Sequence, residues 1–142
     1  MVLQLACAAL LLCVCVVLHA LGTVAITRAV RHHHRDPDVR QLHRPVLGLV
    51  IGLLFVFLLH LVEVSVWAAA YRGVGAFLDF EEALYFSMTS FTTAGYGDLV
   101  APVKWRLLGA SEALVGMVLL GWSVGLVLVL LERMNRRALE ED

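Results

Sequence analysis

The sequence predicts an all-α membrane protein with three transmembrane helices and a short re-entrant helix between the last two. Of the 142 residues, 61% are hydrophobic and the mean hydropathy is +0.85, whereas soluble domains contain about 45–50% apolar residues. The excess is concentrated in three blocks, each longer than the roughly 20 residues that a helix needs to cross a bilayer. The length is sufficient for one domain, and a net charge of -1 gives no indication of nucleic acid as a partner.

The first apolar block predicts an N-terminal transmembrane helix over residues 1–30. A secretory signal begins with basic residues, but the first basic residue here is Arg28, which lies near the end of the block. We therefore expect a retained helix, packed at the periphery of the other helices, rather than a cleaved signal. All three cysteines of the chain lie in this block: Cys7, Cys13 and Cys15. Their spacing matches neither the usual disulfide patterns nor a zinc site, so we interpret them as packing residues.

Basic residues predict how the chain is oriented. They are concentrated in a linker at residues 31–45 and in a tail at residues 132–142, and they are fewer between the second and third apolar blocks. The positive-inside rule therefore places the linker and the tail in the cytoplasm and the N-terminus outside, in the cell (plasma or inner) membrane. The linker also contains four histidines: His32, His33, His34 and His43. We interpret them as part of a solvated segment rather than a metal site, and we expect the linker arginines to contact anionic lipid headgroups.

The second and third apolar blocks predict an outer helix over residues 46–71 and an inner helix over residues 103–131. Between them, Asp79 has the position of a helix cap and Glu82 that of its capping-box partner. The short helix that they predict, residues 80–91, cannot span a bilayer. The alternatives are a re-entrant loop and an amphipathic helix that lies on the outer surface.

The segment that follows the short helix, residues 92–98, favours the re-entrant loop. It reads Thr-Thr-Ala-Gly-Tyr-Gly-Asp, and its glycines permit backbone angles that other residues avoid. Irregular backbone at membrane depth is tolerated only where it is buried in protein or faces water. A ring of inward-turned carbonyls can replace the hydration shell of a cation. The segment therefore predicts a carbonyl-lined cation filter.

Residues 46–131 resemble the two-helix pore domain of potassium channels, especially the small bacterial ones, with an additional transmembrane helix before it. The resemblance covers about two-thirds of the chain and rests on both long helices, the short helix, the Thr-Thr-x-Gly-Tyr-Gly-Asp filter and Pro102. It implies a tetrameric potassium-channel pore fold in membrane lipid, hence a homotetramer, with K⁺ ions in the filter and no organic cofactor. The implied function is passive, potassium-selective ion transport. The implied K⁺ ligands are the carbonyls of Thr93, Ala94, Gly95 and Tyr96.

The resemblance also implies a supporting role for residues around the filter: Thr92, Gly97, Asp98, Thr89, Tyr85 and Phe86. Tyr85 and Phe86 are expected to pack as an aromatic cuff, and Asp98 to lie at the outer mouth. Ala94 replaces the usual valine or isoleucine, and Thr89 replaces a carboxylate that some bacterial members pair with the residue matching Asp98. A non-selective cation channel and a non-conducting pore-fold scaffold or regulatory subunit therefore remain alternatives. An enzyme is not expected, because the sequence has no nucleophile–base pairing, nucleotide loop or metal-ligand spacing.

Three ionisable residues within the predicted outer and inner helices are further candidates: His60, Glu63 and Glu112. Such groups are costly at membrane depth and are functional candidates by default. Glu63 and Glu112 lie at similar distances from the outer ends of their helices, so we hypothesise one buried cluster that supports the filter. The alternative is a separate partner for each residue. The inner helix is also rich in small residues, among which we expect Gly116 to be a gating hinge, with close helix packing as the alternative.

Overall fold

The computed structural model describes residues 1–33 and 43–140, and these ranges form long helices joined by short loops. The elements are α1 (Val2–His33), α2 (His43–Gly73), α3 (Phe80–Phe91), the 3-10 turn η1 (Val103–Trp105) and α4 (Arg106–Glu140). Most of the predicted linker, residues 34–42, and the chain end at 141–142 lie outside the described residues. The side chains on which the linker predictions depend are not among the described ones.

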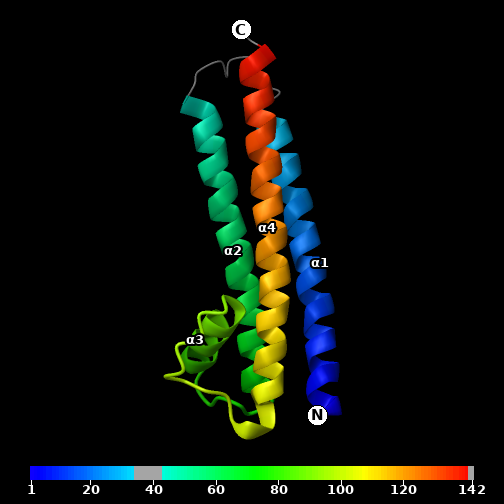
Figure 1. Cartoon of the computed structure of the whole chain (residues 1–142), viewed down its shortest axis with the longest axis vertical. Coiled ribbons are helices and arrows are strands. Elements are labelled where there is room, and N and C mark those ends of the chain that lie inside the picture. The colour runs from blue at the N-terminus through cyan, green and yellow to red at the C-terminus, as the bar shows by residue number, and fades with distance from the viewer. Residues whose placement is uncertain (34–42, 141–142) are drawn as a thin grey trace.

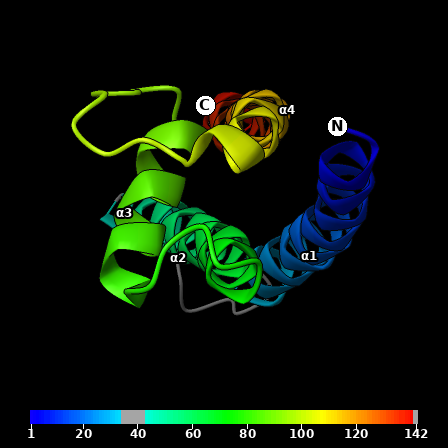
Figure 2. The same cartoon turned by 90° about the horizontal axis from the view of Figure 1, so that it is seen from below.

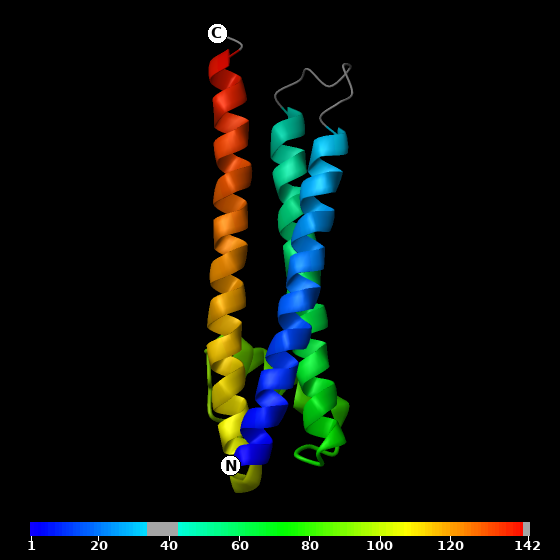
Figure 3. The ribbon, with the colours of Figure 1, turned by 90° about the vertical axis from the view of Figure 1, so that its right-hand side faces the viewer.

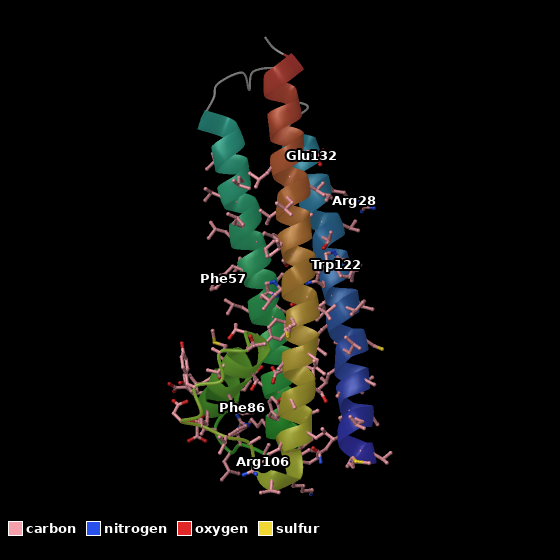
Figure 4. All side chains as sticks on the ribbon, viewed as in Figure 1. Arg28, Phe57, Phe86, Arg106, Trp122 and Glu132 are labelled. Carbon is pink, nitrogen blue, oxygen red and sulfur yellow. The ribbon has the colours of Figure 1, made fainter. Side chains whose placement is uncertain are left out.

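Three of the helices are long and apolar enough to cross a membrane, over Val2–Ala29, Leu47–Gly73 and Val103–Glu132. This confirms the predicted class of an all-α membrane protein with three spanning helices. Large apolar side chains remain exposed along them, among them Leu10, Leu21, Phe57 and Val118. The charged residues that Figure 4 labels, Arg28, Arg106 and Glu132, lie towards the ends of the bundle, whereas Glu63 and Glu112 are buried inside it. A lipid-facing surface accounts for this distribution.

The three long helices run side by side along the long axis, and α3 lies next to the lower half of α2 and α4 (Figure 1). Viewed along that axis, α1 and α3 lie on opposite sides of the pair formed by α2 and α4 (Figure 2). The N-terminal end of α1 therefore lies at the same end of the bundle as α3, and the C-terminal end of α4 lies at the other (Figure 3).

The short helix α3 begins and packs as its sequence directs. Asp79 has an extended backbone and accepts a hydrogen bond from the Glu81 amide at 3.2 Å, which caps the helix. Its buried face packs between α2 and α4 and is formed by Ala83, Phe86, Ser87 and Phe91. The C-terminal end of α3 consequently points into the bundle, where the segment 92–98 begins (Figure 1).

Aromatic rings form the centre of the core at the level of α3. The fully buried Tyr71 ring meets Phe86 and Phe77 edge-on, at centroid distances of 5.2 and 6.1 Å, and such pairs add about 0.5–1.5 kcal/mol to the burial of their area. The same core includes Ala8 and Cys15 of α1. The first helix is therefore an integral part of this bundle.

The long helices extend beyond the apolar blocks. α2 begins at His43 and ends at Gly73, and α4 continues to Glu140 through residues that we expected to form a tail. Residues 132–140 contain no glycine or proline and are rich in strong helix formers. Helical hydrogen bonding thus continues past the membrane boundary.

Candidate functional site

The segment after α3 has the backbone conformation that its glycines permit. The angle φ is positive at Thr93 (60°), Gly95 (51°) and Gly97 (80°), and negative at Ala94 and Tyr96 between them. In a regular strand successive peptide groups point to opposite sides; alternation in the sign of φ instead allows successive carbonyls to face the same side. A positive φ at a β-branched residue such as Thr93 costs about 1–3 kcal/mol. The surrounding structure has to hold this conformation.

The C-terminal turn of α3 supplies that restraint through its backbone carbonyls. A helix C-terminus also carries partial negative charge, which favours a cation nearby. The Thr89 carbonyl accepts a hydrogen bond from the Gly95 amide, while the Thr89 hydroxyl donates to the Phe86 carbonyl at 3.0 Å. Three amides of the segment donate to α3: Thr92 to Met88 (3.1 Å), Thr93 to Ser90 (2.9 Å) and Gly95 to Thr89 (3.0 Å).

The segment 92–98, which we call the predicted filter segment, is anchored at one end but uncovered along its length. Residues 92–98 are all exposed, and the Tyr96 side chain has 74% of its surface accessible. A Cβ added at Gly95 or Gly97 would meet no atom within 4 Å. One chain therefore lines only one side of any ion path along this segment.

The two aromatic residues expected to form a cuff take different positions. Tyr85 donates its hydroxyl to Asp98 at 2.7 Å, whereas Phe86 is buried against Tyr71 in the core. The hydrogen bond from Tyr85 holds the pKa of Asp98 below its ordinary value, and the same bond raises the pKa of Tyr85. Asp98 is thus hydrogen-bonded to the phenol of Tyr85. Thr89, at the position where some bacterial channels carry a carboxylate, cannot supply one.

Gly116 lies where α4 touches the end of α3. A Cβ at this position would be 2.0 Å from the Phe91 carbonyl oxygen, closer than real Cβ atoms approach. Close packing therefore requires a glycine here, whether or not the helix bends. The hinge role stays a prediction.

Glu112 is fully buried between three helices and accepts hydrogen bonds from two hydroxyl groups. Tyr71 of α2 donates to it at 2.6 Å, and Ser87 of α3 lies against its other oxygen. Ser87 also reaches the Val64 carbonyl at 2.9 Å. Glu112 thereby joins α4 to both α2 and α3 behind the predicted filter segment.

Glu63 lies in a second polar group, which joins α1 to α2. Its two carboxylate oxygens face His19 Nδ1 at 2.9 Å and His60 Nδ1 at 2.8 Å. The opposite ring nitrogens face the Ser123 hydroxyl of α4, His60 Nε2 at 2.9 Å and His19 Nε2 at 3.4 Å. Trp122, labelled in Figure 4, packs on the His19 ring with centroids 5.1 Å apart.

The single cluster hypothesised from the sequence is thus divided, because each carboxylate has its own hydrogen-bond partners. Glu63 lies about ten residues from the end of α2, but Glu112 lies only about six from the start of α4, an offset of about 6 Å along the bundle. The sequence reasoning also missed His19 and Ser123. The rule that intramembrane ionisable groups are functional candidates applies to His19 as well and could have identified it.

Three spanning helices that hold a capped short helix and a strained, glycine-bearing segment at one end define a membrane pore protein. A family model described as "Ion channel" matches residues 55–133, which is more than half of the chain. The chain therefore belongs to the ion channel family and is a multi-pass membrane protein. Comparisons with curated proteins and with solved structures gave no match.

Proposed function

We propose that this chain forms a potassium-selective channel, in which K⁺ passes down its gradient through a filter of backbone carbonyls. The carbonyls belong to Thr93, Ala94, Gly95 and Tyr96. The observation that carries the proposal is the alternating sign of φ from Thr93 to Gly97, in a segment tied to the end of α3. Such a segment can present carbonyls in register to replace the hydration shell of an ion.

The channel is a homotetramer. The exposed predicted filter segment supports this, because one chain offers oxygens on one side only and the filters of this class take four such segments. The exposed apolar face of α4, which includes Leu114, Met117 and Val118, offers a surface for neighbouring chains. Thr92, Gly97 and Asp98 hold the ends of the filter in each copy.

The protein lies in the cell membrane with its N-terminus outside and its C-terminus in the cytoplasm. The N-terminal end of α1 and the predicted filter segment lie at the same end of the bundle, away from the C-terminal end of α4 (Figure 1). This arrangement agrees with the distribution of basic residues in the linker and tail.

Flux from reconstituted vesicles tests the function. We expect K⁺ to pass much faster than Na⁺, and Gly95→Ala to abolish flux, because an alanine side chain strains a position with φ of 51°. Gly48→Ala, on the open surface of α2, is the matched control and should conduct normally. Equal K⁺ and Na⁺ flux would instead indicate a non-selective channel, in which the small Ala94 side chain loosens the filter. A well-formed tetramer without flux would indicate a scaffold subunit.

A further inference from the structure

His19, His60 and Glu63 come together inside the helix bundle, away from the proposed ion path. Each offers one ligand atom, and these atoms all lie within 4.8 Å of one another. His19 and Glu63 are at most 1% exposed, and His60 is 14% exposed. We propose that these three residues form a transition-metal site of the zinc class, which fastens the N-terminal helix α1 to the pore helices.

The ligand atoms lie close together, all within 4.8 Å of one another. Both Nδ1 atoms face the Glu63 carboxylate, at 2.9 and 2.8 Å from separate oxygens. Neighbouring ligands of a tetrahedral zinc ion, with bonds of about 2.0–2.1 Å, are about 3.3 Å apart. Each Nδ1–oxygen pair has to open by about 0.5 Å, and ligand atoms that are farther apart, within 4.8 Å, have to close to about 3.3 Å, for an ion to take the place of the shared protons. Water completes the coordination on the side of His60, which is the partly exposed ligand.

The ligand types determine which ions fit. Two imidazoles and one carboxylate suit Zn²⁺, Co²⁺ or Ni²⁺, whereas Ca²⁺ and Mg²⁺ require a shell made mostly of oxygen. The carboxylate supplies the negative charge that a buried cation needs. The rings of Trp122 and Phe91, with centroids 5.1 Å from His19 and 5.8 Å from His60, exclude water from the flanks.

Ser123 gives an independent reason to place a metal here. A histidine that binds a metal through Nδ1 carries its proton on Nε2, and that proton is normally held by a second group. The Ser123 oxygen lies 2.9 and 3.4 Å from the two Nε2 atoms, and its two lone pairs can accept both protons. With neutral rings and no metal, both Nδ1 atoms donate to Glu63, and the single Ser123 proton serves only one of the two Nε2 acceptors. In the metal-bound form all four ring nitrogens have a partner, because both Nδ1 atoms bind the metal and both Nε2 atoms donate to Ser123.

The site is positioned to affect the filter. Its ligands come from α1 and α2, and the hydroxyl that supports them comes from α4. The His60 ring packs on Phe91, the last residue of α3 before the predicted filter segment. A bound ion therefore fixes α1 and stiffens the support behind Phe91.

Metal binding to the full-length protein in detergent tests this proposal without any measurement of flux. Histidines near one another in sequence can take up added metal non-specifically, so the reference protein carries alanine at His32, His33, His34 and His43. After chelator treatment and titration with ZnCl₂, we expect about one Zn²⁺ per chain that survives gel filtration. CoCl₂ should give the visible absorption of a tetrahedral nitrogen–oxygen site. Saturating Zn²⁺ should also raise the unfolding temperature.

Variants identify the ligands. Glu63→Gln and His19→Gln should each remove the cobalt spectrum and the rise in unfolding temperature. Ser123→Ala keeps the three ligands but loses their support, and should weaken Zn²⁺ binding about 10–100-fold. The matched control is Ser111→Ala, because Ser111 donates only to the Leu107 carbonyl of its own helix, and it should bind Zn²⁺ normally.

Two results would overturn the proposal. One is a folded reference protein that takes up no Zn²⁺ or Co²⁺, which would leave a hydrogen-bonded cluster only. The other is uptake that is unchanged in Ser123→Ala and in whichever ligand variants fold. A channel without flux leaves the metal measurement valid, so failure of the proposed function and failure of the metal site are distinguishable.

Discussion

Replacing Gly116 by alanine tests how closely α4 packs on the end of α3. The added Cβ would lie 2.0 Å from the oxygen, 2.7 Å from the carbonyl carbon and 2.9 Å from the Cα of Phe91. Ordinary contacts begin at 3.4 Å, so α4 and the Phe91 backbone must separate by about 1.4 Å in a tightly packed region. The atoms in the way are backbone and cannot rotate aside.

The expected cost follows from two opposing effects. Overpacking costs about 1–3 kcal/mol, with this contact at the upper end, and the better helix propensity of alanine returns about 1 kcal/mol. We therefore expect Gly116→Ala to lose about 1–2 kcal/mol of stability. The shift also moves the start of the predicted filter segment, so flux should fall as well.

Unfolding of the detergent-solubilised protein, followed by tryptophan fluorescence, measures the loss. Gly48→Ala is the control, because a Cβ there meets no atom within 4 Å, and it should be neutral or stabilising by up to about 1 kcal/mol. Equal stability of Gly116→Ala and Gly48→Ala would refute the packing argument. If the opening of the channel then changed while stability did not, Gly116 would act as a hinge instead.

Two further predictions concern hydrogen bonds on either side of the filter. Tyr85→Phe removes the donor that lowers the pKa of Asp98, so this carboxylate should become protonated at a higher pH. In wild type the bond contributes stability above the ordinary carboxyl pKa and loses it as the pH falls through the lowered value; an unchanged carboxyl titration by NMR in the variant would contradict this. Glu112→Gln keeps an acceptor for Tyr71, whereas Glu112→Leu leaves the Tyr71 hydroxyl unpaired at about 1–3 kcal/mol, while Ser87 retains the Val64 carbonyl. Equal unfolding midpoints for these two variants would rule out the assigned bonds.

The membrane fold could be predicted because it depends on local features. Each apolar block is long enough to span, and a helix in lipid must satisfy its own backbone hydrogen bonds. The start of α3 could be predicted equally well, because the Asp79 side chain caps the helix by accepting from an amide only two residues away. Helix, cap and turn signals of this kind are carried by neighbouring residues.

The pairing between helices could not be predicted, because it depends on residues that are far apart in the sequence. His19 and Glu63 are 44 residues apart, and α1 is apolar on all sides, so its sequence does not indicate which face meets α2. The depth of Glu63 was misjudged because α2 continues past the apolar block to Gly73. An offset of about one turn between Glu63 and Glu112 then decides whether the two carboxylates share partners.

Phe91 connects the features that the sequence presented separately. Its ring packs on His60 of the proposed metal site, its carbonyl fills the space left by Gly116, and its peptide leads into the strained segment at Thr93. The end of α3 is thus held by α2 through a side chain and by α4 through a backbone contact. Because interiors are close-packed and yield little, a change in either support displaces this one residue. Metal binding at the proposed site and movement of α4 would therefore act on residues 92–98 through the same point, and their effects should not be additive.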